Sequence, residues 1–224
     1  DVEIGVKTKG EWQLGYLRNY FIAGEEKLAE MDQRALFTGK KVILSLAEKG
    51  GFAESSRCGM EGGTYYWNNP STFCFLEVDK EVNIAFNKIF LEQYKGDQRY
   101  AVSHQGSELV GLAEKEIIIS NQGTQYSLYP HFRINLGYNF DEYFQLQKEA
   151  AGIAQECKAA QKLQECLKKI MPKHWKFGGC EQEAYNEKER KVAFCAESAQ
   201  KYVVFDDGAF IPVRYKFGLN FAST

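Results

Sequence analysis

The stretch YSLYPHFRINLGYNF, residues 126–140, decides the fold class because two structural periods meet where it ends. Its apolar residues occupy even positions: Tyr126, Leu128, Phe132, Ile134, Leu136 and Tyr138. Such alternation predicts a strand with one buried face. Asn139 then offers an N-cap to a long helix from about Phe140 to Met171, and Pro172 ends it.

The chain on either side continues this mixture of helices and strands. Apolar residues at helical intervals from Glu11 to Lys49 predict two or three helices, broken at Gly24 and Gly39. Further elements are expected as a helix over 79–96, strands over 64–67, 73–76, 100–103, 108–112 and 116–120, hairpins turning at 186–189 and 206–208, and a final strand over 211–221. We therefore expect an α+β fold in which a mostly antiparallel sheet packs with long amphipathic helices.

The first residues carry a different pattern. Val2, Ile4 and Val6 alternate with polar residues and predict a short strand, with Lys7-Thr8-Lys9-Gly10 as a hinge. We expect an N-terminal arm over 1–10 and a single α+β domain over 11–224, with a possible division into a helical part, 11–97, and a sheet with the long helix, 98–224. The strand either pairs within its own domain or inserts into the sheet of a neighbouring subunit.

Composition and charge exclude several classes of function. The formal net charge is −2, which gives no general attraction to nucleic acid. No apolar run reaches the roughly 20 residues that span a bilayer, so we expect no transmembrane segment in this chain. The 16 Phe, 13 Tyr and 3 Trp residues indicate a packed core and argue against disorder.

Six cysteines stand at positions 58, 74, 157, 166, 180 and 195, none at metal-ligand or redox spacing. Their even number predicts a disulfide framework, and hence a secreted, extracellular or cell-surface protein. Cys58 with Cys74 and Cys180 with Cys195 are the favoured pairs, the first contributing about 3 kcal/mol. The alternative is six free thiols in a cytosolic protein.

The remaining pair, Cys157 and Cys166, conflicts with a continuous helix. Nine helical residues rise about 13.5 Å, whereas a disulfide needs Cα atoms within about 7 Å. Either the helix breaks near Lys158 to Leu163, or the pairs cross, as in Cys157–Cys195 with Cys166–Cys180.

Candidate sites are few. His104, His131 and His174 lack partners at metal-ligand spacing, and no zinc, redox, phosphate-loop or nucleophile motif is present. We therefore assign no catalytic residue, no metal site and no cofactor. The run Tyr65-Tyr66-Trp67 is the best ligand candidate, because exposed rings can stack on a sugar; a half-buried strand is the favoured interpretation.

Asp206 and Asp207 admit two interpretations. Their carboxylates suit calcium or paired acid chemistry, but an Asp-Gly hairpin turn explains them more simply.

Three segments resemble a loose group of archaeal surface proteins that are secreted or membrane-anchored. They are Leu46-Ala47-Glu48-Lys49-Gly50-Gly51-Phe52, Met171-Pro172-Lys173-His174-Trp175 and Tyr215-Lys216-Phe217-Gly218-Leu219-Asn220-Phe221, together under a fifth of the chain. Members of that group usually carry an N-terminal membrane anchor, which we do not find in this chain. The resemblance implies a surface location and no particular activity.

The sequence predicts an extracellular structural or adhesive cell-surface protein that is not an enzyme. It is expected to form a homo-oligomer or polymer, a self-assembling filament joined by Val2, Ile4 and Val6. A monomeric carbohydrate-binding domain that uses Tyr65, Tyr66 and Trp67 is the alternative, and a cell-wall hydrolase ranks last.

Overall fold

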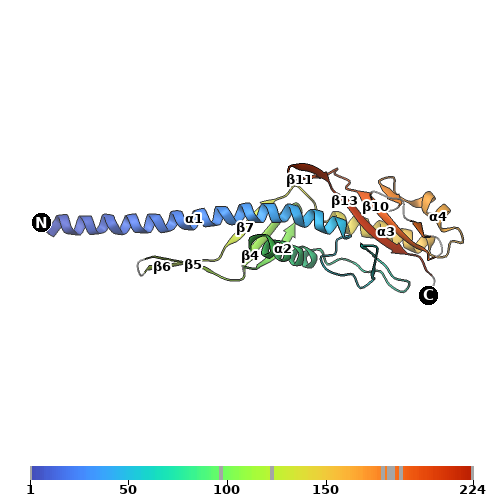
Figure 1. Cartoon of the computed structure of the whole chain (residues 1–224), viewed down its shortest axis with the longest axis horizontal. Helices are drawn as coiled ribbons and strands as arrows, with labels where there is room; N and C mark the ends of the chain where they lie inside the picture. The colour runs from blue at the N-terminus through green and yellow to red at the C-terminus, as the bar shows by residue number, and fades with distance from the viewer. Residues whose placement is uncertain are drawn as a thin grey trace.

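A computed structural model describes residues 2–95, 98–121, 124–177, 180, 185–186 and 189–222, with the backbone alone described for residues 2–17, 20, 119–121, 124, 126 and 185–186. The helices are α1 (Val2–Glu48), α2 (Val78–Tyr94), α3 (Glu142–Cys157) and α4 (Leu163–Ile170). The strands are β1 (Met60–Glu61), β2 (Thr64–Tyr65), β3 (Tyr100–Gln105), β4 (Glu108–Ala113), β5 (Ile117–Asn121), β6 (Thr124–Leu128), β7 (His131–Asn135), β8 (Trp175–Phe177), β9 (Tyr185–Asn186), β10 (Lys191–Glu197), β11 (Val203–Asp206), β12 (Ala209–Pro212) and β13 (Arg214–Asn220). Figure 1 shows a head at one end of the molecule, from which the first half of α1 projects.

Helix α1 is continuous over 47 residues, so the predicted breaks at Gly24 and Gly39 are wrong. A Cβ at Gly39 would lie 3.1 Å from the side chain of Leu136, which means that this glycine lets the helix approach the sheet closely. Gly50 and Gly51, both at positive φ, end the helix.

The predicted N-terminal strand is also wrong, because the backbone from Val2 onward is helical and Lys7–Gly10 is no hinge. Three alternating residues are a short signal. Extending an existing helix by one residue costs much less free energy than nucleating a new element. The long helical pattern that follows therefore continues through these first residues.

A three-stranded antiparallel sheet in the order β3-β4-β7 packs against α1 and α2. The alternation that predicted one strand over 126–138 divides at Pro130 between β6 and β7. Phe132, Ile134, Leu136 and Tyr138 are all buried, as that alternation required.

A second antiparallel sheet has the order β13-β10-β8, with β9 also pairing with β10. Its centre is aromatic: the Trp67 ring stacks on Phe217 at 3.8 Å between centroids, and Trp175 meets Phe217 edge-on at 4.8 Å. Loop residues close the outer edge of β13, since the N–H of Trp67 donates to the carbonyl of Gly218. A predicted final strand over 211–221 is thus divided, with β12 in a separate ribbon.

All three disulfides join the local pairs: Cys58–Cys74, Cys157–Cys166 and Cys180–Cys195. The crossed pairing is therefore wrong, and the expected single helix over 140–171 breaks between α3 and α4. Arg190 holds this break, because its guanidinium donates to the carbonyls of Lys158 at 3.0 Å and Ala160 at 3.1 Å.

The α+β class and the antiparallel pairing are confirmed, but the finer expectation is not. Instead of one large sheet, the described residues form two small sheets and the two-stranded ribbons β1–β2, β5–β6 and β11–β12. Only α1 among the four described helices is long. The turn predicted at 186–189 and the predicted helix end at Gly96 lie partly or wholly outside the described residues.

Candidate functional site

The projecting half of α1 is the first surface without a partner in the head. Among the α1 side chains that the structure describes, Met31 is the first large one that is buried. Before it, Arg18, Phe21 and Ile22 are exposed. Their i, i+3, i+4 spacing places them on one face of the helix, which we call the α1 patch.

The β11–β12 hairpin is the second such surface. Val204 on its inner face is buried, and Ile211 and Pro212 line a cavity together with Leu44 and Ala47 of α1. On the opposite face Val203, Phe205 and Phe210 are exposed, with 5.0 Å between the two phenyl centroids. We call these three side chains the hairpin outer face.

The tip and the base of this hairpin add two features. Asp206 and Asp207 stand at the tip, where Asp207 has φ 45° and Gly208 has φ 82°. The predicted Asp-Gly hairpin turn is therefore confirmed. At the base, Tyr202, Val203 and Pro212 help to line a cavity of about 310 Å³.

A third arrangement lies between α2 and the outer edge of β3. The carboxamide of Asn87 donates to the carbonyl of Tyr100 and accepts from its N–H, both at 2.8 Å. Asn83 accepts from the N–H of Val102 at 2.9 Å, and Asp79 accepts from the N–H of His104 at 2.9 Å. We call Asp79, Asn83 and Asn87 the α2 ladder.

The α2 ladder works because two periods coincide. Four helical residues rise about 6.0 Å, and two strand residues advance about 6.7 Å. Successive ladder residues therefore pair with alternate residues of β3. Their side chains make the hydrogen bonds to β3 that a neighbouring strand would otherwise make. Sequence reasoning missed this ladder, although a polar residue at every fourth position of α2 is a visible signal.

His104 belongs to the same surface. Its ring lies 2.7 Å from Asp79 through Nδ1 and 3.3 Å from Asp141 through Nε2. The imidazole thus links the start of α2 to the start of α3.

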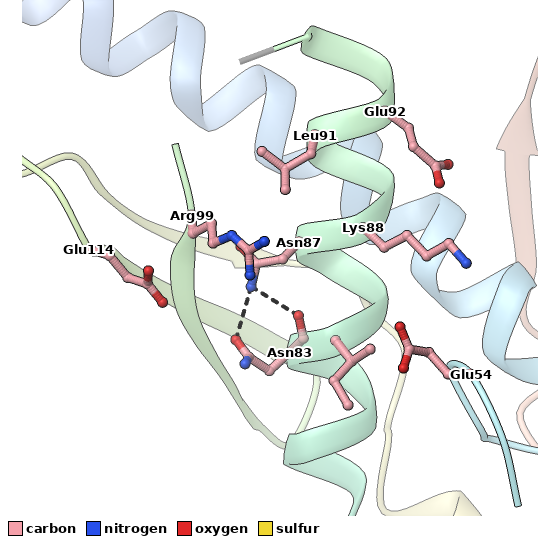
Figure 2. A pocket seen from close by; sticks show the side chains of 9 residues that line it. Glu54, Asn83, Asn87, Lys88, Leu91, Glu92, Arg99 and Glu114 are labelled. Atoms are coloured by element: carbon pink, nitrogen blue, oxygen red, sulfur yellow. Dashed lines mark hydrogen bonds between the residues drawn. The ribbon is translucent and has the colours of Figure 1, made fainter. Parts of the chain in front are cut away.

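A cleft of about 540 Å³ lies beside the ladder, and Figure 2 shows the side chains that line it. Arg99 and Glu114 lie on one flank of α2, and Lys88, Glu92 and Glu54 lie on the other. Charges of both signs line the cleft, so it favours neither an anionic nor a cationic ligand.

The predicted aromatic ligand site is not a platform. Trp67 is 0% exposed, and its indole N–H donates to the carbonyl of Gly50 at 2.8 Å. Tyr65 is buried as well. Tyr66 is half-buried and donates to Glu61 at 3.1 Å; burial, with Glu61 alongside, raises the pKa of Tyr66 to about 12. The half-buried strand was the better interpretation, because the rings of Tyr65 and Trp67 pack into the core and Tyr66 is half-buried.

A polar cluster inside the head centres on Glu142. Its carboxylate accepts from the hydroxyls of Tyr215 and Ser198, both at 2.9 Å, and the Tyr138 hydroxyl lies 2.5 Å from that of Tyr215. Burial raises the pKa values of Tyr138 and Tyr215 well above the ordinary range. These hydroxyls stay protonated, and their role is to join α3 to β13.

Among the described residues, no group of three or more His, Cys, Asp or Glu side chains is arranged to hold a metal ion. None of the described helices has the length and apolar character that crossing a membrane requires. Val2, Ile4 and Val6 lie in the backbone-only part of α1, so their suggested subunit contacts stay a prediction. No family model, no curated protein and no solved structure matches the chain.

Proposed function

We propose that this protein is an extracellular structural subunit that assembles with copies of itself at the cell surface, through the projecting half of α1. One observation carries the proposal: the first half of α1 projects from the head (Figure 1), and its side chains Phe21 and Ile22 are exposed. Helices of this length are marginal in water, and most helical stability comes from packing an apolar face. A second copy supplies that packing.

Two further properties support this proposal. Three disulfides suit an oxidising compartment, where secreted and surface proteins reside. A net charge of only −2 leaves little repulsion between copies, and low net charge favours association. Strand addition at the N-terminus is not part of the proposal, because that segment is helical.

Light scattering and sedimentation velocity on non-reduced protein test this function. The complete chain is compared with a variant that begins at Gly24 and with one that lacks only residues 1–9. We expect assembly by the complete chain, a monomer for the Gly24 variant, and the same Tm for both heads, since the deletion ends before Met31. The 1–9 deletion measures what Val2, Ile4 and Val6 contribute.

The matched control for this experiment is Phe144→Ser, which removes an exposed phenyl ring from α3 without touching α1. It is expected to assemble as the original chain does. A complete chain that stays monomeric at every concentration, or a Gly24 variant that assembles equally well, would contradict the proposal.

A further inference from the structure

We propose that the α1 patch of one copy docks on the hairpin outer face of another copy. This inference rests on the proposed self-assembly and adds the acceptor surface, which the sequence did not indicate. The donor is Arg18, Phe21 and Ile22; the acceptor is Val203, Phe205 and Phe210 with the acidic tip.

The hairpin outer face is an unusual surface for a lone molecule. Phe210 is 77% exposed, the highest value among the large apolar side chains of the described residues. A contiguous apolar patch on a soluble protein marks an interaction site. A two-stranded ribbon is also marginal alone, and here only the inner face has support, from α1.

Chemistry makes the α1 patch the matching occupant. It presents a phenyl ring and a branched aliphatic side chain beside one guanidinium, and the acceptor presents two phenyl rings next to the exposed carboxylate of Asp207 at the turn. Apolar groups therefore meet apolar groups while Arg18 faces Asp207, and such complementarity guides association and fixes the register. Val203 also lines the cavity of about 310 Å³ at the hairpin base, and the side chain of Phe21 inserts into this cavity in the proposed contact.

Distance excludes the same contact within one molecule. The hairpin base lies at Leu44 and Ala47, which a straight helix places about 33 Å from Ile22. The four-residue strands of the hairpin span only about 13 Å. Because α1 is one continuous helix, the patch reaches a hairpin only in another copy.

Two different surfaces that meet in this way form a heterologous interface. Each bound copy still offers one free patch and one free hairpin, so addition continues as an open polymer unless the geometry closes a ring. This distinguishes the arrangement from a symmetric dimer, in which the same surface is used twice.

The test uses complementation between two variants of the complete chain. Phe21→Ser disrupts the α1 patch, which is the donor surface, and Phe210→Ser disrupts the hairpin outer face, which is the acceptor surface. Each substitution is expected to weaken self-association at least about tenfold. Mixed in equal amounts, they retain one intact donor and one intact acceptor, so the mixture forms a dimer of twice 25.6 kDa and stops there. Val203→Ser provides a second acceptor variant, and Phe144→Ser is the control that still assembles.

Charge exchange checks the register. Arg18→Glu is expected to weaken assembly several-fold, and Asp207→Lys in the same chain restores it. The tip tolerates lysine, because Lys95 and Lys201 already have φ values of 48° and 49°, close to the 45° of Asp207.

The outcomes separate the two proposals. If the unaltered chain never assembles, the proposed function fails and this inference fails with it. If the chain assembles and Phe210→Ser assembles as well, the function stands and the hairpin is overturned as the acceptor. A mixture of the two variants that yields no dimer also overturns the heterologous contact.

Discussion

Glu81 shows how one residue makes the stability of the head depend on pH. Its carboxylate accepts a hydrogen bond from the N–H of Ala53 at 2.8 Å. Burial nevertheless raises the pKa of Glu81, and the nearby Glu77 and Glu54 raise it further, against the opposing effects of Ala53 and Lys80. The folded protein therefore holds this proton more tightly than the unfolded chain does.

The sign of the effect follows from proton linkage. Where the folded state binds more protons, the free energy of unfolding falls as the pH rises through the interval between the unfolded and folded pKa values. Glu81→Gln keeps an oxygen that accepts from Ala53 and cannot ionise. We expect the variant to gain stability relative to the original chain as the pH goes from 4 to 7, measured by urea unfolding at each pH.

Glu92→Gln is the matched control, because Glu92 is an exposed carboxylate on the same helix and its loss changes the net charge equally. Its stability relative to the original chain is expected to change less over that range. An equal response of the two variants would mean that the effect arises from net charge and not from the burial of Glu81.

At the scale of elements, the α2 ladder closes an edge that a sheet would otherwise present to other chains. Asn87 satisfies both backbone groups of Tyr100, a residue that is 1% exposed. Asn87→Ala leaves these groups without a partner, which costs about 1–3 kcal/mol for each buried group left unpaired.

Urea unfolding of Asn87→Ala against Lys88→Ala tests this role. Lys88 is the next residue, exposed on the same turn, and its truncation is expected to cost within about 0.5 kcal/mol. The Asn87 variant is also expected to aggregate more readily, because the edge of β3 is open. Equal costs for the two variants would refute the ladder as a stabilising contact.

Elements with a local signal could be predicted from the sequence. Spacing favoured the pairs Cys58–Cys74 and Cys180–Cys195, and both are observed. For Cys157 and Cys166, helix geometry left two alternatives, a break near residues 158–163 or crossed pairs, and the structure has the break. The α2 helix could be predicted because its apolar residues recur with a period of 3.6. The β11–β12 turn could be predicted from its Asp-Gly pair.

Features that depend on tertiary packing could not be predicted. Gly39 suggested a helix break because glycine is a poor helix former. Only the close packing of the sheet against this position explains why a glycine stands inside a continuous helix. Trp67 is a residue type that can stack on a sugar ring. Here the ring of Phe217, 150 residues later in the chain, covers its face instead. The ladder requires the register of α2 against β3, and the acceptor role of the hairpin requires knowing which of its faces meets α1.

At the scale of the molecule, the two halves of α1 have different environments, and hydrogen exchange distinguishes them. Buried residues between Met31 and Ala47 pack on the head, whereas the first half of α1 projects from it (Figure 1). Amides that are not held by packing exchange through frequent local opening, and packed ones exchange only through rarer events. In a monomer, we expect fast exchange before Gly24 and slow exchange after Met31.

Assembly changes this contrast if the projecting half packs on another copy. In polymers of the complete chain, amides around Arg18 to Ile22 and in β11–β12 are expected to gain protection together, because they form the two sides of one contact. The Phe210→Ser variant serves as the monomeric reference, and its head amides are expected to exchange as in the polymer. Protection that appears on α1 without any change in the hairpin would show that the helix packs against a different surface of its neighbour.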